Sequence, residues 1–537
     1  MQDTSTRNGS GSATDRAGLD GALHPVCPMD LSALRPVPVA SAEDVQAAVR
    51  RARRAQEQWS ATPLTQRVER MRAAARDMLA RRHEVMELVR SEIGKTDAEA
   101  LFNEALGPLD TVTGWASIVS AHCEPKSVFL NPVAFPGKKA QVEQVPRGVV
   151  GVIAPWNYPV AGLYRSVFPA LMTRNGLVLK PAEHSPRSSA WLVEVLAAHL
   201  PDGLVAAVQG DGRVGEALLD AGIDACVFTG SPATGRKVRA RCAERGIPCS
   251  AEMGGKDAAI VLEDCDMERA VAGITAWALG NAGQACGAIE VAYVERTIAD
   301  AFVQRLARAW SRLRAAPGPH GETDVAPLAH RAQFDLVRAH VDDARAKGAV
   351  VVCGGAPTGV GLYYQPTLLD RCTEDMAVVR DETFGPVLAV VRVEGASDAA
   401  ARVNAARYGL GASIWTRDTA RARRLAARLN VGVVTVNNHA FSGAIPALPW
   451  SGTRDTGYGV ANSALALPTF VRPRTLVVDE ASAHELYWPP YDRGLLEFGD
   501  ILSDVQRGVV GRAWRLPLLL RDRMRALRDF FREEGVR

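Results

Sequence analysis

Three polar residues stand in sequence surroundings that favour chemistry. Cys286 has a glycine close on either side, which leaves room for a reactant to approach the sulfur. Glu252 lies among apolar residues and glycines, where loss of water would raise its pKa towards that of a general base. Asn157, enclosed by prolines, can donate an amide N–H to a developing oxyanion. Each also has a commoner explanation, as a buried thiol, a solvated charge or a turn cap.

A glycine-containing segment at 228–235 adds a weak signal for a phosphate group. It runs from a predicted strand into a predicted helix, so its backbone N–H groups can face an anion. It is not the G-x-G-x-x-G pattern, and alone it decides nothing.

Short apolar runs alternate with helical segments from about residue 148 onward. Such runs are typical of buried parallel strands, and the helices predicted at 187–200 and 212–221 favour a doubly wound α/β domain. Upstream, Ser41 and Asp44 form a variant of the capping box before the first of three predicted helices, at 42–59, 63–82 and 83–93. The predicted strands are 148–155, 176–181, 206–210, 225–231 and 258–262, then, after Cys286, 291–294, 349–355, 387–393, 411–416 and 431–438.

Composition narrows the class of protein. The 537 residues are 47% hydrophobic and 23% charged, with a net charge of +3, which excludes wholesale disorder and a general nucleic-acid-binding surface. Nine scattered cysteines without a C-x-x-C pair predict neither a metal site nor a disulfide framework. The polar N-terminus lacks the apolar region of a secretory signal, so we expect a cytoplasmic protein. The uncharged stretch 270–289 favours a buried helix and loop over a membrane span.

Taken together, the motifs resemble the aldehyde dehydrogenase superfamily over roughly residues 40 to 480. The order and spacing of these motifs make the resemblance specific. They are PWNYP at 155–159, LKPAE at 179–183, FTGS at 228–231, EMGGK at 252–256, GQAC at 283–286, ETFGPV at 382–387, NAARYGLGASIWT at 404–416 and, more loosely, PWSGTRDTGYG at 449–459.

The resemblance implies a hydrolytic, NAD-dependent oxidation of an aldehyde. Cys286 would add to the aldehyde and pass through a thiohemiacetal and a thioester. Asn157 would hold the oxyanion, and Glu252 would activate the hydrolytic water. Tyr158 and Arg165 would contact the substrate, because relatives that oxidise succinic semialdehyde carry arginine at this spacing. The alternative for Arg165 is a structural salt bridge. Gly287, next to the nucleophile, predicts an open wall of the aldehyde pocket.

The same resemblance implies the residues that bind NAD, with NADP as the less favoured cofactor. Lys180 and Glu183 would bind the adenosine ribose, and Ser231 would lie near the pyrophosphate. Glu382 would hold the nicotinamide ribose, with Phe384 packing near the nicotinamide. Four further positions complete the predicted cofactor site: Pro155, Trp156, Gly230 and Gly254.

The fold implied is α/β, with a Rossmann-like cofactor domain, an α/β catalytic domain and a small β arm for oligomerisation. The expected boundaries are a flexible N-terminus at 1–40, the NAD-binding domain at 41–125 and 147–252, the catalytic domain at 253–440, the arm at 126–146 and 468–480, and a helical extension at 481–537. A homodimer or homotetramer is expected. Two alternatives stay open: a CoA-acylating relative, disfavoured by Glu252, and a non-catalytic binding protein, disfavoured by the three catalytic-type residues.

The extension beyond residue 480 contains two apolar stripes at helical spacing. The first comprises Leu495, Phe498, Leu502, Val505 and Val509, and the second comprises Leu520, Met524, Leu527 and Phe531. Arginines flank the second stripe, a pattern also typical of a helix lying in a membrane interface. We favour docking on the protein's own surface or on a sister subunit over peripheral membrane contact.

Overall fold

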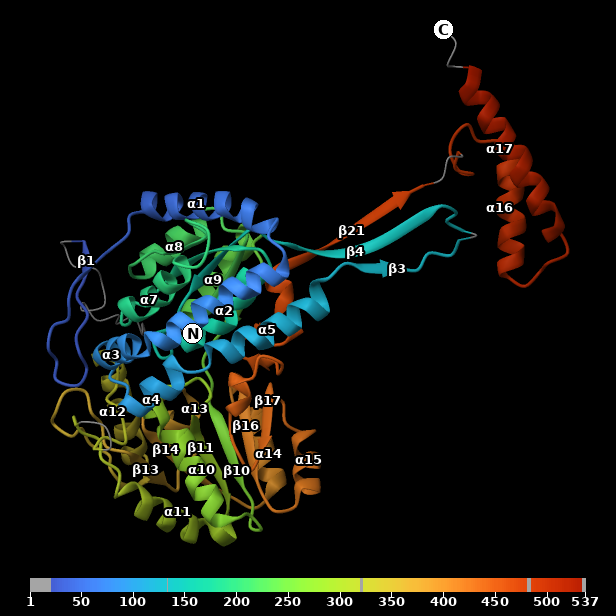
Figure 1. The fold of residues 1–537 in the computed structure, drawn as a ribbon. Helices are drawn as coiled ribbons and strands as arrows, with labels where there is room; N and C mark the ends of the chain where they lie inside the picture. The colour runs from blue at the N-terminus through green and yellow to red at the C-terminus, as the bar shows by residue number, and fades with distance from the viewer. Residues whose placement is uncertain (1–20, 133, 319–321, 481–483, 534–537) are drawn as a thin grey trace, which may run out of the picture. The chain divides into compact units, whose positions relative to one another are not determined.

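The computed structural model describes residues 21–132, 134–318, 322–480 and 484–533. The chain divides into two compact units. The larger, here called the core unit, comprises the residues up to 124 together with 145–472, and the smaller, here called the tail unit, comprises 125–144 and 473–537 (Figure 1).

A parallel five-stranded sheet lies in the first half of the core unit, in the order β7-β6-β5-β8-β9. On β5, Val150 and Val152 face one apolar cluster while Val149 and Ile153 face another, so both faces are buried. This explains why the strands are continuous apolar runs in sequence. The strands are β5 (Val149–Ile153), β6 (Gly176–Lys180), β7 (Val205–Ala207), β8 (Ala225–Thr229) and β9 (Cys249–Glu252), and the helices are α1 (Ala42–Ser60), α2 (Leu64–Ala80), α3 (Arg82–Ile93), α4 (Asp97–Ala100), α5 (Pro108–Cys123), α6 (Tyr164–Met172), α7 (Pro186–Ala197), α8 (Gly212–Asp220) and α9 (Pro232–Glu244).

A seven-stranded sheet forms the second half, in the order β12-β13-β14-β11-β10-β16-β17, and its pairs are parallel except β12 with β13. The run at 258–262, which lies within the expected catalytic domain at 253–440, is β10 and pairs with β11 and β16. The strands are β10 (Asp257–Val261), β11 (Ile289–Glu295), β12 (Val350–Cys353), β13 (Thr367–Asp370), β14 (Val387–Val393), β16 (Gly411–Trp415) and β17 (Val433–Val436), and the helices are α10 (Met267–Leu279), α11 (Arg296–Trp310), α12 (Arg331–Ala346), α13 (Ala377–Arg380), α14 (Ala396–Ala405) and α15 (Thr419–Ala426).

Short strand pairs complete the core unit: β15 (Tyr408–Gly409) with β19 (Thr453–Arg454), and β18 (Trp450–Ser451) with β20 (Val460–Ala461). The predicted helices at 42–59, 63–82 and 83–93 are confirmed as α1, α2 and α3, and the capping box of Ser41 and Asp44 is present.

The segment 21–40 differs from the expected flexible N-terminus. It contains β1 (Ala22–Leu23), which pairs with β2 (Val37–Pro38), and Leu23 and Cys27 are buried. The N–H of Leu362 donates to the carbonyl of Pro28 at 2.8 Å, so this segment is joined to the second half of the core unit. The expected flexibility of residues 1–20 lies outside the described residues.

The tail unit contains a three-stranded sheet and two helices. Its strands are β3 (Lys126–Val128), β4 (Lys138–Pro146) and β21 (Val471–Asp479), in the order β21-β4-β3. The first predicted apolar stripe lies in α16 (Arg493–Gln506) except for Val509, which follows the end of this helix, and the second lies wholly in α17 (Leu516–Glu533). Ile501 and Leu527 are fully buried in this unit. Among the described residues, no helix has the length and apolar character that a membrane crossing needs.

Candidate active site

Cys286 follows α10 in a tightly constrained turn. Gly283 has a φ of +69°, and a Cβ built there would lie 2.1 Å from the carbonyl oxygen of Gly385. Glycine is therefore required for this close approach. The side chain of Gln284 accepts a hydrogen bond from the N–H of Ala329 at 2.8 Å and fixes the loop just before the thiol.

Asn157 is joined to the same loop. Its Nδ2 donates to the carbonyl of Gln284 at 3.0 Å, and Nδ2 of Asn281 donates to the carbonyl of Asn157 at 3.2 Å. The side chain is buried, with 7% exposed. Asn157 is thus hydrogen-bonded to Gln284, which stands two residues before Cys286, although 128 residues lie between Asn157 and Cys286 in the sequence.

Glu252 ends strand β9 and shares a small enclosed cavity with Cys286. The cavity is also lined by Thr229, Leu410 and Trp450, and its volume is about 10 Å³. A single water molecule needs a space of roughly this size. A carboxylate, a thiol and room for about one water therefore meet at one place.

Burial and one cation set the protonation of these two groups. Burial raises the pKa of Glu252, and the charge of Arg165, whose Nη1 lies 3.5 Å from the Glu252 carboxylate, lowers it in part. Burial raises the pKa of the Cys286 thiol to about 12, again opposed by Arg165. The thiol is therefore protonated near neutral pH, and Arg165 is the cation that most favours its ionisation.

Tyr158 and Arg165, the two predicted substrate residues, lie near Cys286. The Nζ of Lys95 stands 3.9 Å from the centre of the Tyr158 ring and 3.3 Å from the Glu104 carboxylate, and both charged side chains are fully buried. The Nε of Arg165 donates to the carbonyl of Gly162 at 3.4 Å. Sequence reasoning missed Lys95 and Glu104, because charged side chains are usually solvated.

The predicted NAD residues lie at the carboxyl ends of three adjacent strands. Lys180 ends β6, Pro155 and Trp156 follow β5, and Gly230 and Ser231 follow β8. Ligands of open α/β sheets bind along this edge.

Lys180 and Glu183 pair with each other along this edge. The Nζ of Lys180 lies 3.3 Å from the Glu183 carboxylate and donates to the carbonyl of Gly210 at 3.1 Å. Burial alone would raise the pKa of Glu183, but the charges of Lys180 and His184 hold it below its ordinary value. Glu183 is therefore ionised at neutral pH.

Ser231 caps the helix that begins at this edge. Its hydroxyl oxygen accepts from the N–H of Thr234, at the N-terminus of α9. The N–H of Gly230 donates to the carbonyl of Glu252 at 3.1 Å, which links the predicted cofactor loop to the strand that carries the predicted base.

Glu382 and Phe384 are held by a network that sequence reasoning missed. The Glu290 carboxylate accepts the N–H groups of Thr383 and Phe384, each at 2.8 Å, and forms a buried ion pair with Lys256. The carboxylate of Glu382 accepts the N–H of Gly255 at 2.9 Å, and a Cβ on Gly254 would lie 2.2 Å from it. Burial raises the pKa of Glu382 to about 8.

The aromatic rings of Trp156 and Phe384 meet edge to face, with centroids 5.5 Å apart. The open wall expected at Gly287 is not present, because a Cβ there would lie 3.0 Å from the Trp450 ring. Trp450 therefore occupies the space that the missing side chain leaves.

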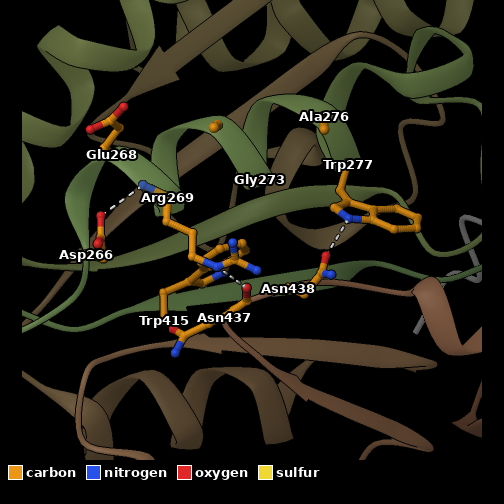
Figure 2. A pocket seen from close by; sticks show the side chains of 10 residues that line it. Asp266, Glu268, Arg269, Gly273, Ala276, Trp277, Trp415, Asn437 and Asn438 are labelled. Atoms are coloured by element: carbon orange, nitrogen blue, oxygen red, sulfur yellow. Dashed lines mark hydrogen bonds between the residues drawn. The ribbon is translucent and has the colours of Figure 1, made fainter.

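A second, wider hollow of about 610 Å³ lies beside α10, lined by Arg269, Trp277 and Asn438 among others (Figure 2). Trp277 donates to the side chain of Asn438 at 3.1 Å, and Arg269 donates to the carbonyl of Asn437 at 3.0 Å. It includes none of the predicted site residues.

Comparison with known proteins places the chain in a family. A model of the aldehyde dehydrogenase family matches residues 17–476. The 4,4'-diapolycopene aldehyde oxidase of a Methylomonas species is 35% identical over 482 residues, covering 88% of this chain and 90% of its own. A Mycobacterium ulcerans (strain Agy99) protein named "Putative succinate-semialdehyde dehydrogenase (NADP(+)) 2" is 36% identical, covering 82% and 86%. The structure of a Mycobacterium tuberculosis aldehyde dehydrogenase complexed with NAD+ is 30% identical, with a TM-score of 0.81, covering 87% of this chain and 96% of that one.

The chain therefore belongs to the aldehyde dehydrogenase family of oxidoreductases. The predicted fold class is confirmed by the same comparisons.

The contact between Arg165 and the buried site predicts how thiol reactivity depends on pH. Removing the cation in Arg165→Ala raises the pKa of Cys286, so less thiolate is present at any given pH. Alkylation of Cys286 by iodoacetamide should slow by up to about tenfold at pH 8, and its rate should rise only at higher pH. Peptide mass spectrometry would follow the labelling. Arg165→Lys, which keeps a charge, is the control, and equal slowing in both variants would contradict the electrostatic role.

Proposed function

We propose that this protein oxidises an aldehyde to a carboxylate with NAD, using Cys286 as nucleophile and Glu252 as the base for hydrolysis. The supporting observation is the small cavity that both side chains line. The Cys286 sulfur adds to the aldehyde carbon, and Nδ2 of Asn157 with the N–H of Cys286 stabilises the resulting oxyanion. Bound NAD would supply the hydride acceptor that turns the thiohemiacetal into a thioester. Glu252 then takes a proton from water as it attacks the thioester, which releases the carboxylate and restores the thiol.

The chain's own residues fit NAD at the edge of the five-stranded sheet. Ser231 begins α9, where free backbone N–H groups suit a pyrophosphate. Lys180 and Glu183 would hold the adenosine ribose, and Glu382 with Phe384 would hold the nicotinamide half. We favour NAD over NADP, because a 2′-phosphate would meet the ionised carboxylate of Glu183, although Lys180 at 3.3 Å lessens that repulsion.

Both alternative functions lack support from this arrangement. A CoA-acylating relative needs no base for water, yet Glu252 lies in the cavity with Cys286. A non-catalytic binding protein needs no aligned thiol, amide and carboxylate.

The assignment predicts different defects in two variants. Cys286→Ser should lose nearly all oxidation, because a hydroxyl is barely ionised at neutral pH. Glu252→Gln should slow turnover by roughly 10²–10⁴-fold and leave an acyl-enzyme visible by intact mass. NADH absorbance would measure activity, with a larger kcat/KM for NAD than for NADP in the native enzyme. Ordinary steady-state turnover in either variant would refute the roles.

For the substrate we propose an aldehyde that also carries a carboxylate. The two curated relatives differ in the substrates their names state, so the choice depends on this chain's residues. The side chain of Arg165 is 21% exposed and lies beside Glu252, and its buried Nη1 has no hydrogen-bond acceptor. Arg165 forms a salt bridge with Glu252, as the alternative expectation stated. This salt bridge lies within the candidate site, where a substrate carboxylate can pair with the arginine.

Arg165→Ala should therefore raise KM for a carboxylated aldehyde by roughly tenfold or more and change KM for an aliphatic aldehyde of equal length far less. Comparing the KM ratio of the two substrates cancels the common effect on thiol ionisation. A ratio unchanged by the substitution would remove the support for a carboxylated substrate.

We further propose that the tail unit serves assembly into a homodimer or homotetramer of a cytoplasmic enzyme. Strand β21 is exposed along eight of its nine residues, and large apolar side chains such as Trp488, Leu502 and Trp514 remain exposed in this unit. Such surface suits docking on a sister subunit.

Deleting residues 512–537 should lower the thermal midpoint or change the oligomer size, because it exposes the apolar side of α16. Size-exclusion chromatography with light scattering would measure the mass. Binding to anionic liposomes tests the alternative, which is peripheral membrane contact. If the native protein binds these liposomes in a salt-sensitive manner, and the deletion abolishes binding without changing the oligomer size, the tail contacts membranes and docking is refuted.

A further inference from the structure

Three cysteines that are far apart in sequence meet in the core unit. Cys226 is on β8, Cys242 is on α9 and Cys249 begins β9, and their sulfur atoms all lie within 4.8 Å of one another. Cys226 and Cys249 are register partners on adjacent parallel strands, so their side chains point to the same face of the sheet. The last turn of α9 brings Cys242 over them.

The local backbone holds this arrangement firmly. The N–H of Ile247 donates to the carbonyl of Cys242 at 2.9 Å, and the N–H of Cys226 donates to the carbonyl of Pro248 at 2.9 Å. The turn between α9 and β9 is thereby tied to Cys242 on α9 and to Cys226 on β8. Cys226 and Cys242 are 0% and 1% exposed, whereas Cys249 is half-buried and gives an approach from solvent.

We propose that Cys226, Cys242 and Cys249 form a binding site for a single soft monovalent cation, Cu(I). Thiolates are the ligands that such ions prefer. With a metal–sulfur bond of about 2.3 Å, three sulfurs around one ion stand about 4 Å apart, close to the spacing present here. A disulfide would instead require two sulfurs to close to about 2.05 Å and would leave the third unused.

The donor set also selects against Zn²⁺. Structural zinc sites take four protein ligands, and among the described residues this group contains no fourth His, Cys, Asp or Glu. Binding replaces the three thiol protons by the ion, so three thiolates and one Cu(I) leave the loaded site with two negative charges.

The site lies on the segment that carries the proposed chemistry. Strand β8 leads to Gly230 and Ser231, and β9 ends at Glu252. An ion shared by β8, α9 and β9 would therefore stiffen the part of the sheet that holds the proposed base and the pyrophosphate loop.

The test is an anaerobic titration of the reduced full-length protein with Cu(I) in the presence of a competing Cu(I) chelator, which suppresses binding to single thiols. We expect one retained ion per chain by native mass spectrometry, thiolate-to-copper absorption in the ultraviolet, and a higher thermal midpoint. Cys242→Ala and Cys249→Ser should each weaken retention at least tenfold and abolish the rise in thermal midpoint.

Matched controls are Cys372→Ala, a buried cysteine elsewhere, and Cys286→Ser, which removes the proposed nucleophile. Both should retain the ion as the native protein does, so the test is independent of catalytic activity. Equal retention by Cys249→Ser, or no ion retained against the chelator, would overturn the proposal.

Discussion

The close approach of three chain segments at Gly254 and Gly255 is the constraint on which the site depends. A Cβ on Gly254 would lie 2.2 Å from the Glu382 carboxylate, and one on Gly255 would lie 2.3 Å from the carbonyl oxygen of Cys286. The carbonyl oxygen of Cys286 belongs to the backbone, so Gly255 admits no side chain, whereas a side chain at Gly254 would displace the Glu382 carboxylate. At these two glycines, the loop that carries Cys286 and the loop that carries Glu382 both contact the turn that begins at Gly254, two residues after Glu252.

Around this contact, buried ions fix the loops. Glu290 accepts two backbone N–H groups of the Glu382 loop and pairs with Lys256, which itself follows the two glycines. A buried ion pair is costly unless its hydrogen bonds are satisfied, and here the carboxylate binds both an ammonium and backbone donors. The arrangement gives the loop one defined position next to the predicted nicotinamide site.

The same burial that orders the site also opposes the ionisation of its thiol and its carboxyl group. It raises the pKa of both Cys286 and Glu252, and Arg165 lowers both. One arginine thus influences the nucleophile, the proposed base and, in our proposal, the substrate carboxylate. A substrate that pairs with Arg165 would free Glu252 from it, which links substrate binding to the state of the base.

The sequence by itself predicted the first three helices and most strands of the two large sheets, though not β9 or β13, because apolar periodicity, glycines and prolines act within a few positions of the chain. It also predicted the helical stripes of the tail, apart from Val509, which follows α16. Only the tertiary structure decided that Trp450 fills the space beside Gly287 and that Arg165 pairs with Glu252. It alone placed Lys95 against Tyr158 and gathered Cys226, Cys242 and Cys249. These contacts join residues that are far apart in sequence. They depend on the order of the strands and on packing between elements, which no local sequence pattern encodes.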